Sequence, residues 1–295
     1  MRVLISGASG LVGRALAARF EERGDTVVAL VRRRDALGIF WDPKSGHLDS
    51  AAAEAADAVV HLAGENVASG RWTPARRAEI RDSRVIGTRM LAERLAALKR
   101  PPAVMIAASA IGFYGDGDDT VQTEKSALGR GFLAEVCRDW EAACEPAAKR
   151  GIRVVSLRIG LVLTGRGGAL RQMLPVFRLG LGARIGDGRQ WMSWITLGDL
   201  VRVVEHVLTD DELHGPVNAT APQPVRNSEF TRTLARVLRR PVLLAIPAFV
   251  LHAALGEMAD EMLLTSARVV PERLEQRGFH FEHPALEPAL RGLLG

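Results

Sequence analysis

The chain contains little cysteine, one tyrosine and no long apolar run. Its two cysteines, Cys137 and Cys144, lie in a predicted helix, about 10.5 Å apart along the helix axis, which is too far for a disulfide. No histidine accompanies them, so we expect no metal site. No apolar run reaches the roughly 20 residues of a membrane helix. The sequence therefore predicts a reduced, cytoplasmic protein with no membrane partner.

The remaining composition is that of an ordinary globular protein. The 295 residues are 47% hydrophobic and 25% charged, a length that suits one large domain or a core with a smaller addition. The net charge of +5 would suit a polyanion. Lysine is scarce, however, and the arginines are scattered, so we expect no nucleic-acid partner. Residues 1–6 lead directly into a glycine-rich turn, and we expect no cleaved signal peptide.

The beginning of the chain has the pattern of a βαβ unit. Residues 2–6 are an apolar run, and apolar residues at helical spacing follow from Leu11 to Phe20, with Gly24 as the stop. Residues 26–31 form a second apolar run. A strand, a helix and a strand within about 30 residues imply two parallel strands.

The alternation continues to about residue 165. Further apolar runs occur at 58–64, 104–109 and 152–158, and helical patterns lie between them around 75–98 and 132–150. Alternating strands and helices predict the α/β class, here a doubly wound parallel Rossmann sheet.

Three glycines occupy the turn after the first strand, with the spacing GxxGxxG. Glycine lets the backbone turn sharply and approach a pyrophosphate, and the free N–H groups of the following helix start attract an anion. This context predicts a dinucleotide site. The contacts we expect in the turn are Gly7, Ser9, Gly10, Leu11, Val12 and Gly13. The alternative is a tight turn that binds nothing.

The end of the second strand distinguishes between dinucleotides. A carboxylate there would bind a ribose 2′-hydroxyl, but Val31 is followed by Arg32, Arg33 and Arg34. Guanidinium groups suit a 2′-phosphate through charge-assisted hydrogen bonds. We therefore predict NADP(H) as the cofactor, with Val31, Arg32 and Arg33 among its contacts. The alternative is that these arginines only solvate a loop.

The pattern changes after residue 165. A helix is predicted at 169–179, a glycine-rich segment with tryptophans at 180–194, and a helix of the main layer at 197–208. We predict an NADP-binding Rossmann domain over 1–165, to which 195–222 returns. The segments 166–194 and 223–295 would form a smaller, mostly helical substrate and C-terminal region.

Several short motifs along the whole chain are more specific than the glycine turn. They include Leu62-Ala63-Gly64-Glu65-Asn66, Arg71-Trp72, Gly112-Phe113-Tyr114-Gly115, Trp140-Glu141, Asn218-Ala219-Thr220-Ala221-Pro222 and Gly256-Glu257-Met258-Ala259-Asp260. With these motifs the chain resembles the extended short-chain dehydrogenase/reductase superfamily, which includes sugar-nucleotide epimerases and dehydratases. Within it the chain is most similar to the subgroup called "epimerase family protein", also described as similar to a cell-division inhibitor.

The resemblance implies more cofactor contacts and a mode of assembly. The further contacts are Leu62, Ala63, Gly64, Glu79, Arg84 and Val162. Small residues after the strand at 58–64 would permit close approach, and Arg84 would suit a phosphate. Core packing is the alternative for Leu62, Ala63 and Val162. Related proteins often pair through the helices around 75–98 and 132–150, which implies a homodimer.

The chain departs from the superfamily at the catalytic positions. Enzymes that move a hydride use a Ser or Thr, a Tyr and a Lys, the last two spaced four apart on one helix. Ungapped counting puts Ala110, Leu133 and Cys137 at these positions. The only tyrosine, Tyr114, precedes a glycine-rich loop and is not the helix tyrosine.

Other polar and aromatic groups are expected to line the cleft. They are Ser109, Tyr114, Glu124, Cys137, Arg158, Gln190, Trp191 and Trp194. Tyr114 with Glu124 is a candidate acid–base pair, and Cys137 is a candidate nucleophile if its pKa is depressed. A structural or substrate-contacting role is the alternative for each, so the catalytic residues remain unknown.

Two functions fit these observations. The first is an NADP(H)-dependent oxidoreductase or epimerase-like protein that acts on an unknown small-molecule substrate without the usual Ser/Tyr/Lys set. The second is a non-catalytic NADP(H)-binding regulatory protein linked to cell division.

Overall fold

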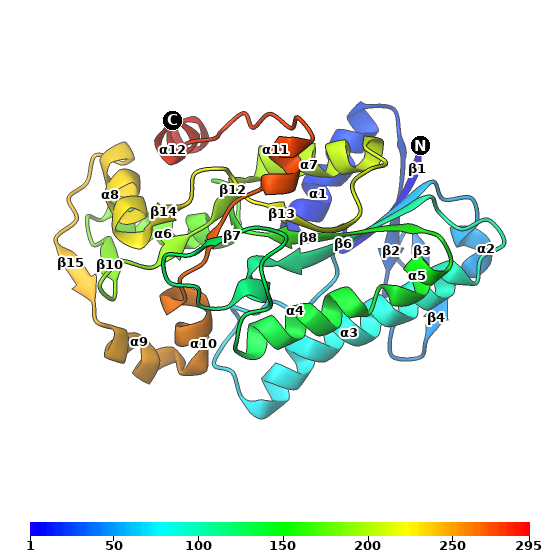
Figure 1. The fold of residues 1–295 in the computed structure, drawn as a ribbon, viewed down its shortest axis with the longest axis horizontal. Helices are drawn as coiled ribbons and strands as arrows, with labels where there is room; N and C mark the ends of the chain where they lie inside the picture. Colours follow the sequence, from blue (N-terminus) through cyan, green and yellow to red (C-terminus); the bar gives the residue numbers. More distant parts are fainter.

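A twisted, mostly parallel sheet forms the centre of the computed structural model, which describes residues 1–295 (Figure 1). Its eight strands run in the order β13-β8-β6-β5-β1-β2-β3-β4, and only β3 and β4 pair antiparallel. In chain order these strands are β1 (Arg2–Ser6), β2 (Thr26–Val31), β3 (Ile39–Asp42), β4 (His47–Leu48), β5 (Ala58–His61), β6 (Val104–Ala110), β8 (Arg153–Ile159) and β13 (Gly215–Ala219). The α/β class and the doubly wound parallel sheet are therefore confirmed.

Helices cover both faces of the sheet. They are α1 (Leu11–Glu22), α2 (Ser50–Ala53), α3 (Pro74–Ala96), α4 (Phe132–Ala142), α5 (Glu145–Lys149) and α7 (Leu197–Thr209). Alternate residues of β1 point to opposite faces: Val3 and Ile5 join the core beneath α1 and α7, and Leu4 joins the core beneath α3. Figure 1 shows α3 and α4 side by side on one face, with α1 and α7 on the other.

The single helix predicted over 132–150 is wrong at its centre. The structure ends α4 at Ala142 and begins α5 at Glu145. Pro146 has no N–H group, so it cannot donate to the carbonyl of Ala142, four residues earlier. That carbonyl instead accepts a hydrogen bond from Nη2 of Arg89, at 3.3 Å.

A third core lies beyond the carboxyl end of the sheet. It is built by α6 (Gly168–Arg178), α8 (Asn227–Val237) and α12 (Leu286–Leu294) around the fully buried Trp194. Further along the chain lie α9 (Ala248–Leu255), α10 (Glu257–Ala259) and a π-helical turn, η2, at Asp260–Leu264. The last short helix, α11 (Glu272–Gln276), instead packs Leu274 into the core beneath α1 and α7.

Short strand pairs accompany these helices, so this part of the chain is less purely helical than the sequence suggested. They are β9 (Leu161–Leu163) with β12 (Trp194–Thr196), β10 (Ala183–Ile185) with β15 (Leu244–Ile246), β11 (Trp191–Met192) with β14 (Val225–Arg226), and β7 (Val121–Gln122) with β16 (Arg268–Val269). No helix combines the length and the apolar character needed to cross a bilayer.

Candidate cofactor and substrate site

The glycine turn after β1 is packed backbone against backbone. Gly7 has φ +70°, a conformation that favours glycine, and its carbonyl accepts the N–H of Gly10 at 2.9 Å. A Cβ at Gly13 would lie 2.2 Å from that same carbonyl oxygen. Only a glycine therefore lets α1 approach the turn so closely.

The N-terminus of α1 is bare. Gly10 is its N-cap, no side chain caps it, and its first turn carries no acidic residue. The amides around Leu11 and Val12 and the helix dipole are thus available to an anion. The cradle and the free helix end together fit a pyrophosphate group.

Two other segments meet this turn. A Cβ at Gly7 would lie 3.0 Å from the carbonyl carbon of Leu62, so the loop after β5 passes directly beside it. On the other side Gly167 covers Leu11, since a Cβ there would lie 2.9 Å from the Leu11 side chain. Val162 stands in β9 just before that glycine loop, opposite Ile195. The predicted contacts in these three segments are therefore neighbours.

A buried polar chain fixes the loop after β5. The Ser6 hydroxyl accepts the N–H groups of Leu62 and Ala63, at 3.1 and 3.2 Å. It also bonds to Nδ1 of His61 at 2.6 Å, and Nε2 of His61 bonds to Thr88 at 3.0 Å. Sequence reasoning missed Ser6 and His61, because buried polar pairing across strands leaves no periodic signal.

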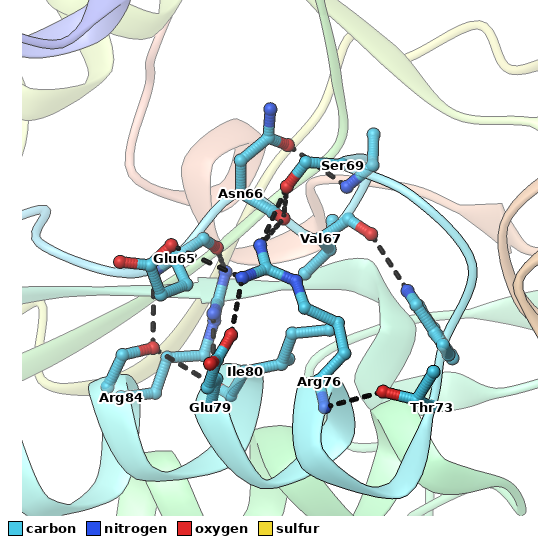
Figure 2. A network of polar contacts seen from close by, with 12 residues as sticks. Glu65, Asn66, Val67, Ser69, Thr73, Arg76, Glu79, Ile80 and Arg84 are labelled. Atoms are coloured by element: carbon cyan, nitrogen blue, oxygen red, sulfur yellow. Dashed lines mark hydrogen bonds and ion pairs between the residues drawn. The ribbon is translucent and has the colours of Figure 1, made fainter.

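Arg84 lies across Gly64 and holds the next part of the loop. Its Nη2 donates to the carbonyl of Glu65 at 2.9 Å and its Nη1 to that of Ile80 at 3.0 Å. A Cβ at Gly64 would lie 3.3 Å from the guanidinium carbon. Burial lowers the pKa of Arg84. Figure 2 shows Arg84 reaching from α3 to Glu65.

Glu79 acts in the same network through Arg76. One Arg76 amino group bonds to Glu79 at 2.8 Å, and the other donates to the Asn66 carbonyl and to Ser69 at 2.6 and 2.7 Å. In Figure 2 Arg76 stands at the centre of these contacts. The structure thus places Glu79 as an exposed partner of the arginine that holds the loop at 66–69.

The three arginines after β2 differ in what they contact. Arg33 forms a forked pair with Asp35, at 3.0 and 2.5 Å, and this hydrogen bonding lowers the pKa of Asp35. Arg34 lies 4.3 Å from the centre of the Phe40 ring. Arg32 is exposed and has no hydrogen bond or ion pair. Arg32 is therefore the guanidinium that is free to meet a ligand.

A second buried network joins α4 to the ends of β6, β8 and β13. Glu141 on α4 accepts two hydrogen bonds from Arg158, both at 2.8 Å, and one from Ser109 at 2.7 Å. Arg158 also donates to the Tyr114 hydroxyl at 3.0 Å, which in turn donates to Asn218 at 2.6 Å. These polar groups thus satisfy one another.

Three predicted cleft residues are buried in ways that limit their chemistry. Burial raises the pKa of Tyr114 to about 12 and that of Cys137 to about 12. The condition for a nucleophilic Cys137, a depressed pKa, is therefore not met. Burial also raises the pKa of Glu124, whose Oε1 accepts the N–H of Asn218 at 2.9 Å while Oε2 has no partner. Tyr114 and Glu124 both meet Asn218 but do not bond to each other.

The tryptophans do not line a common cleft, contrary to expectation. Trp194 is fully buried in the third core, and its indole N–H donates to the carbonyl of Gln223. Trp191 lies between Arg226 and Arg268, whose guanidinium carbons are 4.2 and 4.5 Å from its ring centre. Trp194 therefore serves packing, because its large apolar ring fills a small core, whereas Trp191 stacks with arginines at the surface of the segment.

Gln190 is also a structural residue. It is buried, and its amide donates to the carbonyls of Ile185 and Leu263 at 3.2 and 3.0 Å. It therefore ties the β10 segment to η2 of the C-terminal region.

A pocket of about 340 Å³ opens beside Leu133, the residue at the predicted tyrosine position. Its lining comes from the segment after β6, the start of α4 and η2: Gly112, Gly115, Asp116, Arg130, Leu133, Asp260, Glu261, Leu264 and Thr265. We call it the α4 pocket. Sequence reasoning missed its C-terminal wall, because residues 260–265 carry no motif that links them to α4.

Three side chains of the kinds that bind metal ions have their ligand atoms close together: Asp199, Glu282 and His283. The Asp199 carboxylate, however, already accepts hydrogen bonds from Thr196, Arg202, Glu282 and His283. Four donors fill the acceptor sites of this carboxylate, so Asp199 ties the first turn of α7 to the backbone of residues 282–283.

Comparisons with known proteins agree with this geometry. The model of the "NAD dependent epimerase/dehydratase family" matches residues 3–219, and that of a "Domain of unknown function (DUF1731)" matches residues 246–293. The "Epimerase family protein Mb2239" of Mycobacterium bovis is 46% identical over 290 residues, which cover 98% of this chain and 96% of that protein.

Two solved structures are similar over the whole chain. The crystal structure of the human epimerase family protein SDR39U1 (isoform 2) with NADPH has a TM-score of 0.92 at 33% identity, covering 99% of each chain. The nucleoside-diphosphate sugar epimerase from Corynebacterium glutamicum has a TM-score of 0.82 at 38% identity, covering all of this chain and 58% of that one. The chain thus belongs to the NAD dependent epimerase/dehydratase family of the extended short-chain dehydrogenase/reductases.

Proposed function

We propose that the protein binds NADP(H) and works as an oxidoreductase or epimerase-like enzyme on a small-molecule substrate. The observation that carries the proposal is the Gly7–Gly13 turn, closed against the bare N-terminus of α1. The free guanidinium of Arg32 at the end of β2 supports the 2′-phosphate form. The NADPH in the crystal structure of human SDR39U1 supports the same cofactor.

The proposed cofactor residues fall into groups according to the part of NADP(H) that each would contact. The turn at 7–13 would hold the pyrophosphate, and Val31, Arg32 and Arg33 the adenosine end. The remainder of the cofactor would be contacted by Leu62, Ala63, Gly64, Arg84 and Val162. Glu79 would support the loop after β5 indirectly, through Arg76. When bound, NADPH supplies a hydride to a carbonyl carbon whose oxygen takes a proton, which yields an alcohol and NADP⁺.

The proton for the substrate's carbonyl oxygen would have to come from a source other than the usual Ser, Tyr and Lys. α4 carries Leu133 and Cys137 where the superfamily has tyrosine and lysine, and neither is an acid at neutral pH. The hydroxyl protons of Ser109 and Tyr114 are directed to Glu141 and Asn218. We therefore propose that solvent water at the α4 pocket supplies the proton.

Leu133 and Cys137 also fit a second function, in which the protein binds NADP(H) without catalysis. A protein that binds NADP(H) without turnover needs the glycine turn but no proton donor, and an apolar Leu133 with a buried Cys137 suits it. In that case NADP(H) is a regulatory ligand, and the similarity to a cell-division inhibitor suggests its setting.

An isotope experiment separates the two functions. The protein is incubated with NADPH deuterated at either face of C4, together with sugar nucleotides, ketones and enals. Transfer of deuterium to any compound supports the enzyme. Tight NADPH binding with the label fully retained throughout the panel supports the regulatory protein.

Three expectations stay predictions. They are the division into domains at 1–165 with 195–222 and at 166–194 with 223–295, a homodimer through the helices around 75–98 and 132–150, and a cytoplasmic location. Consistent with the first, β13 joins the main sheet, and 166–194 and 223–295 contribute no strand to it.

A further inference from the structure

The α4 pocket lies where a substrate would react in the proposed function, on which this inference rests. Gly112 follows β6 at the carboxyl edge of the sheet and contacts Leu133, since a Cβ at Gly112 would lie 3.3 Å from the Leu133 side chain. Ligands of open α/β sheets bind beyond that edge. The opposite wall is supplied by η2, so the reacting end of a substrate would lie between the sheet and the C-terminal segment.

Glu261 occupies the N-terminus of α4 at this pocket, a helix end that would otherwise attract an anion. Its two carboxylate oxygens accept the N–H groups of Phe132 and Leu133, at 2.7 and 2.9 Å, and so cap the N-terminus of α4. A Cβ at Gly131 would lie 2.3 Å from Glu261 Oε1, and Gly131 has φ +110°. The chain's own carboxylate therefore takes the helix end that a phosphate could have used.

The remaining charges of the pocket are mostly negative. Asp116 and Asp260 are exposed at its wall, and Arg130 is the only basic residue of the lining. The backbone N–H of Ser266 donates to Asp116, and Asp260 pairs with His252 at 2.9 Å. Arg130 has no ion pair. Three carboxylates face one guanidinium, and a diphosphate would meet repulsion without a second cation to offset it.

We propose that the substrate of the α4 pocket is a small carbonyl compound that is uncharged or positively charged, and not a nucleoside diphosphate sugar. Leu133 and Leu264 supply apolar contact for such a compound, and the carboxylates of Asp116 and Asp260 attract a cationic group at its far end. The similarity to a nucleoside-diphosphate sugar epimerase in fold and sequence does not extend to the charge this pocket would need for that ligand.

Three matched probes test the charge preference directly. Benzaldehyde, 4-formylbenzoate and (4-formylphenyl)trimethylammonium share a ring and an aldehyde but carry different charges. Binding to the protein loaded with NADP⁺, which cannot reduce an aldehyde, is measured by saturation-transfer NMR titration at low ionic strength. The cationic probe should bind at least about fivefold more tightly than the anionic one, with the neutral probe between them. UDP-glucose should show no saturable binding.

A double variant assigns the preference to the pocket. Asp116→Asn with Asp260→Asn removes two negative charges and should reduce the difference between the cationic and anionic probes to about twofold or less. Asp119→Asn is the matched control, because Asp119 is outside the lining and pairs with Arg226. That control should keep the preference of the parent protein. Glu261 is left in place because it caps α4.

Several results would overturn the proposal. They are tighter binding of 4-formylbenzoate, equal or absent binding of all three aldehydes, saturable binding of UDP-glucose, or an unchanged preference in the double variant. NADPH oxidation is followed separately. Binding in the expected order without NADPH oxidation supports the pocket's charge preference and counts against the enzyme function. NADPH oxidation with the reverse order of binding supports the enzyme function and refutes the charge preference.

Discussion

Ser6 on β1 and His61 on β5 are joined by a buried hydrogen bond of 2.6 Å between Oγ and Nδ1. The Ser6 oxygen already accepts two backbone N–H groups, so its single proton goes to His61. Nδ1 is then an acceptor, and Nε2 carries the imidazole proton that bonds to Thr88. Because this chain requires a neutral imidazole, protonation of His61 would break the support of the loop beside the glycine turn.

The free energy of unfolding should decrease when the pH is lowered, because His61 is buried as a neutral imidazole. Burial lowers its pKa from 6.5 to about 4. The unfolded chain takes up a proton below pH 6.5 and the folded chain only near pH 4, so stability is complete above 6.5 and is lost as the pH falls toward 4. The free energy of unfolding should drop by about 2 kcal/mol between pH 7 and pH 5 from this group.

Chemical unfolding at these two pH values checks the prediction. His61→Gln lacks the titrating imidazole and should show a smaller drop, although it will be less stable at pH 7. His47→Gln, at an exposed position, should keep the drop of the parent protein. Equal drops in all three proteins would show that His61 does not contribute.

Arg32→Ala should weaken NADPH binding without affecting NADH. Loss of a charge-assisted hydrogen bond to the 2′-phosphate should raise the Kd for NADPH by about tenfold or more. Arg33→Ala should have a smaller effect, because Arg33 is already paired with Asp35. Titration calorimetry with both cofactors measures this, and NADH binding as tight as NADPH in the parent protein would refute the cofactor preference.

Gly13→Ala should damage the glycine turn far more than Gly10→Ala. A Cβ at Gly13 would lie 2.2 Å from the Gly7 carbonyl oxygen, whereas one at Gly10 would lie 3.1 Å from it with φ −73°, which alanine adopts easily. We expect Gly13→Ala to cost about 1–3 kcal/mol and to abolish NADPH binding. Thermal unfolding with and without NADPH compares the two variants, and an equal ligand-induced rise in Tm would contradict the expectation.

Breaking the Glu141–Arg158 pair should strongly destabilise the fold. The side chains are 16% and 4% exposed, and removal of one partner leaves a buried charge unpaired. Glu141→Gln and Arg158→Met should each cost about 3 kcal/mol, and the double variant should cost less than their sum. Urea unfolding of the four proteins gives the coupling, and strict additivity would mean that the pair contributes little.

Both cysteines should be inert in the folded protein. Burial raises the pKa of Cys137 and that of Cys144 to about 12, so almost no thiolate forms at pH 8. Iodoacetamide should leave both thiols unmodified in the native state and modify both in denaturant, as read by mass spectrometry. Ser45→Cys, at an exposed site, supplies a thiol that reacts natively. Rapid native alkylation of Cys137 would reopen its role as a nucleophile.

The local features of the fold could be read from the chain. The strand at residues 2–6, the glycine turn and the helix from Leu11 depend on contacts within a few residues, and the structure has them at nearly the predicted bounds. The break before Pro146 was missed although its cause is local, because the apolar spacing on either side continues in phase and hides the missing N–H group.

The polar networks could not be predicted. Tyr114 meets Asn218 across 104 residues of sequence, and Glu261 caps the helix that begins at Phe132 from 129 residues away. The acceptor that pairs with a buried donor depends on which elements pack together, and the spacing of residues along the chain does not predict it.

The sequence by itself determined the parallel sheet, the glycine turn between β1 and α1 and the absence of tyrosine and lysine from α4, because each depends on residue types at short, fixed spacings. Only the tertiary structure decided which arginine after β2 is free, and which charges surround the α4 pocket. Those outcomes depend on side chains that meet through packing, where the free energy of burying each polar group is balanced by partners from distant parts of the chain.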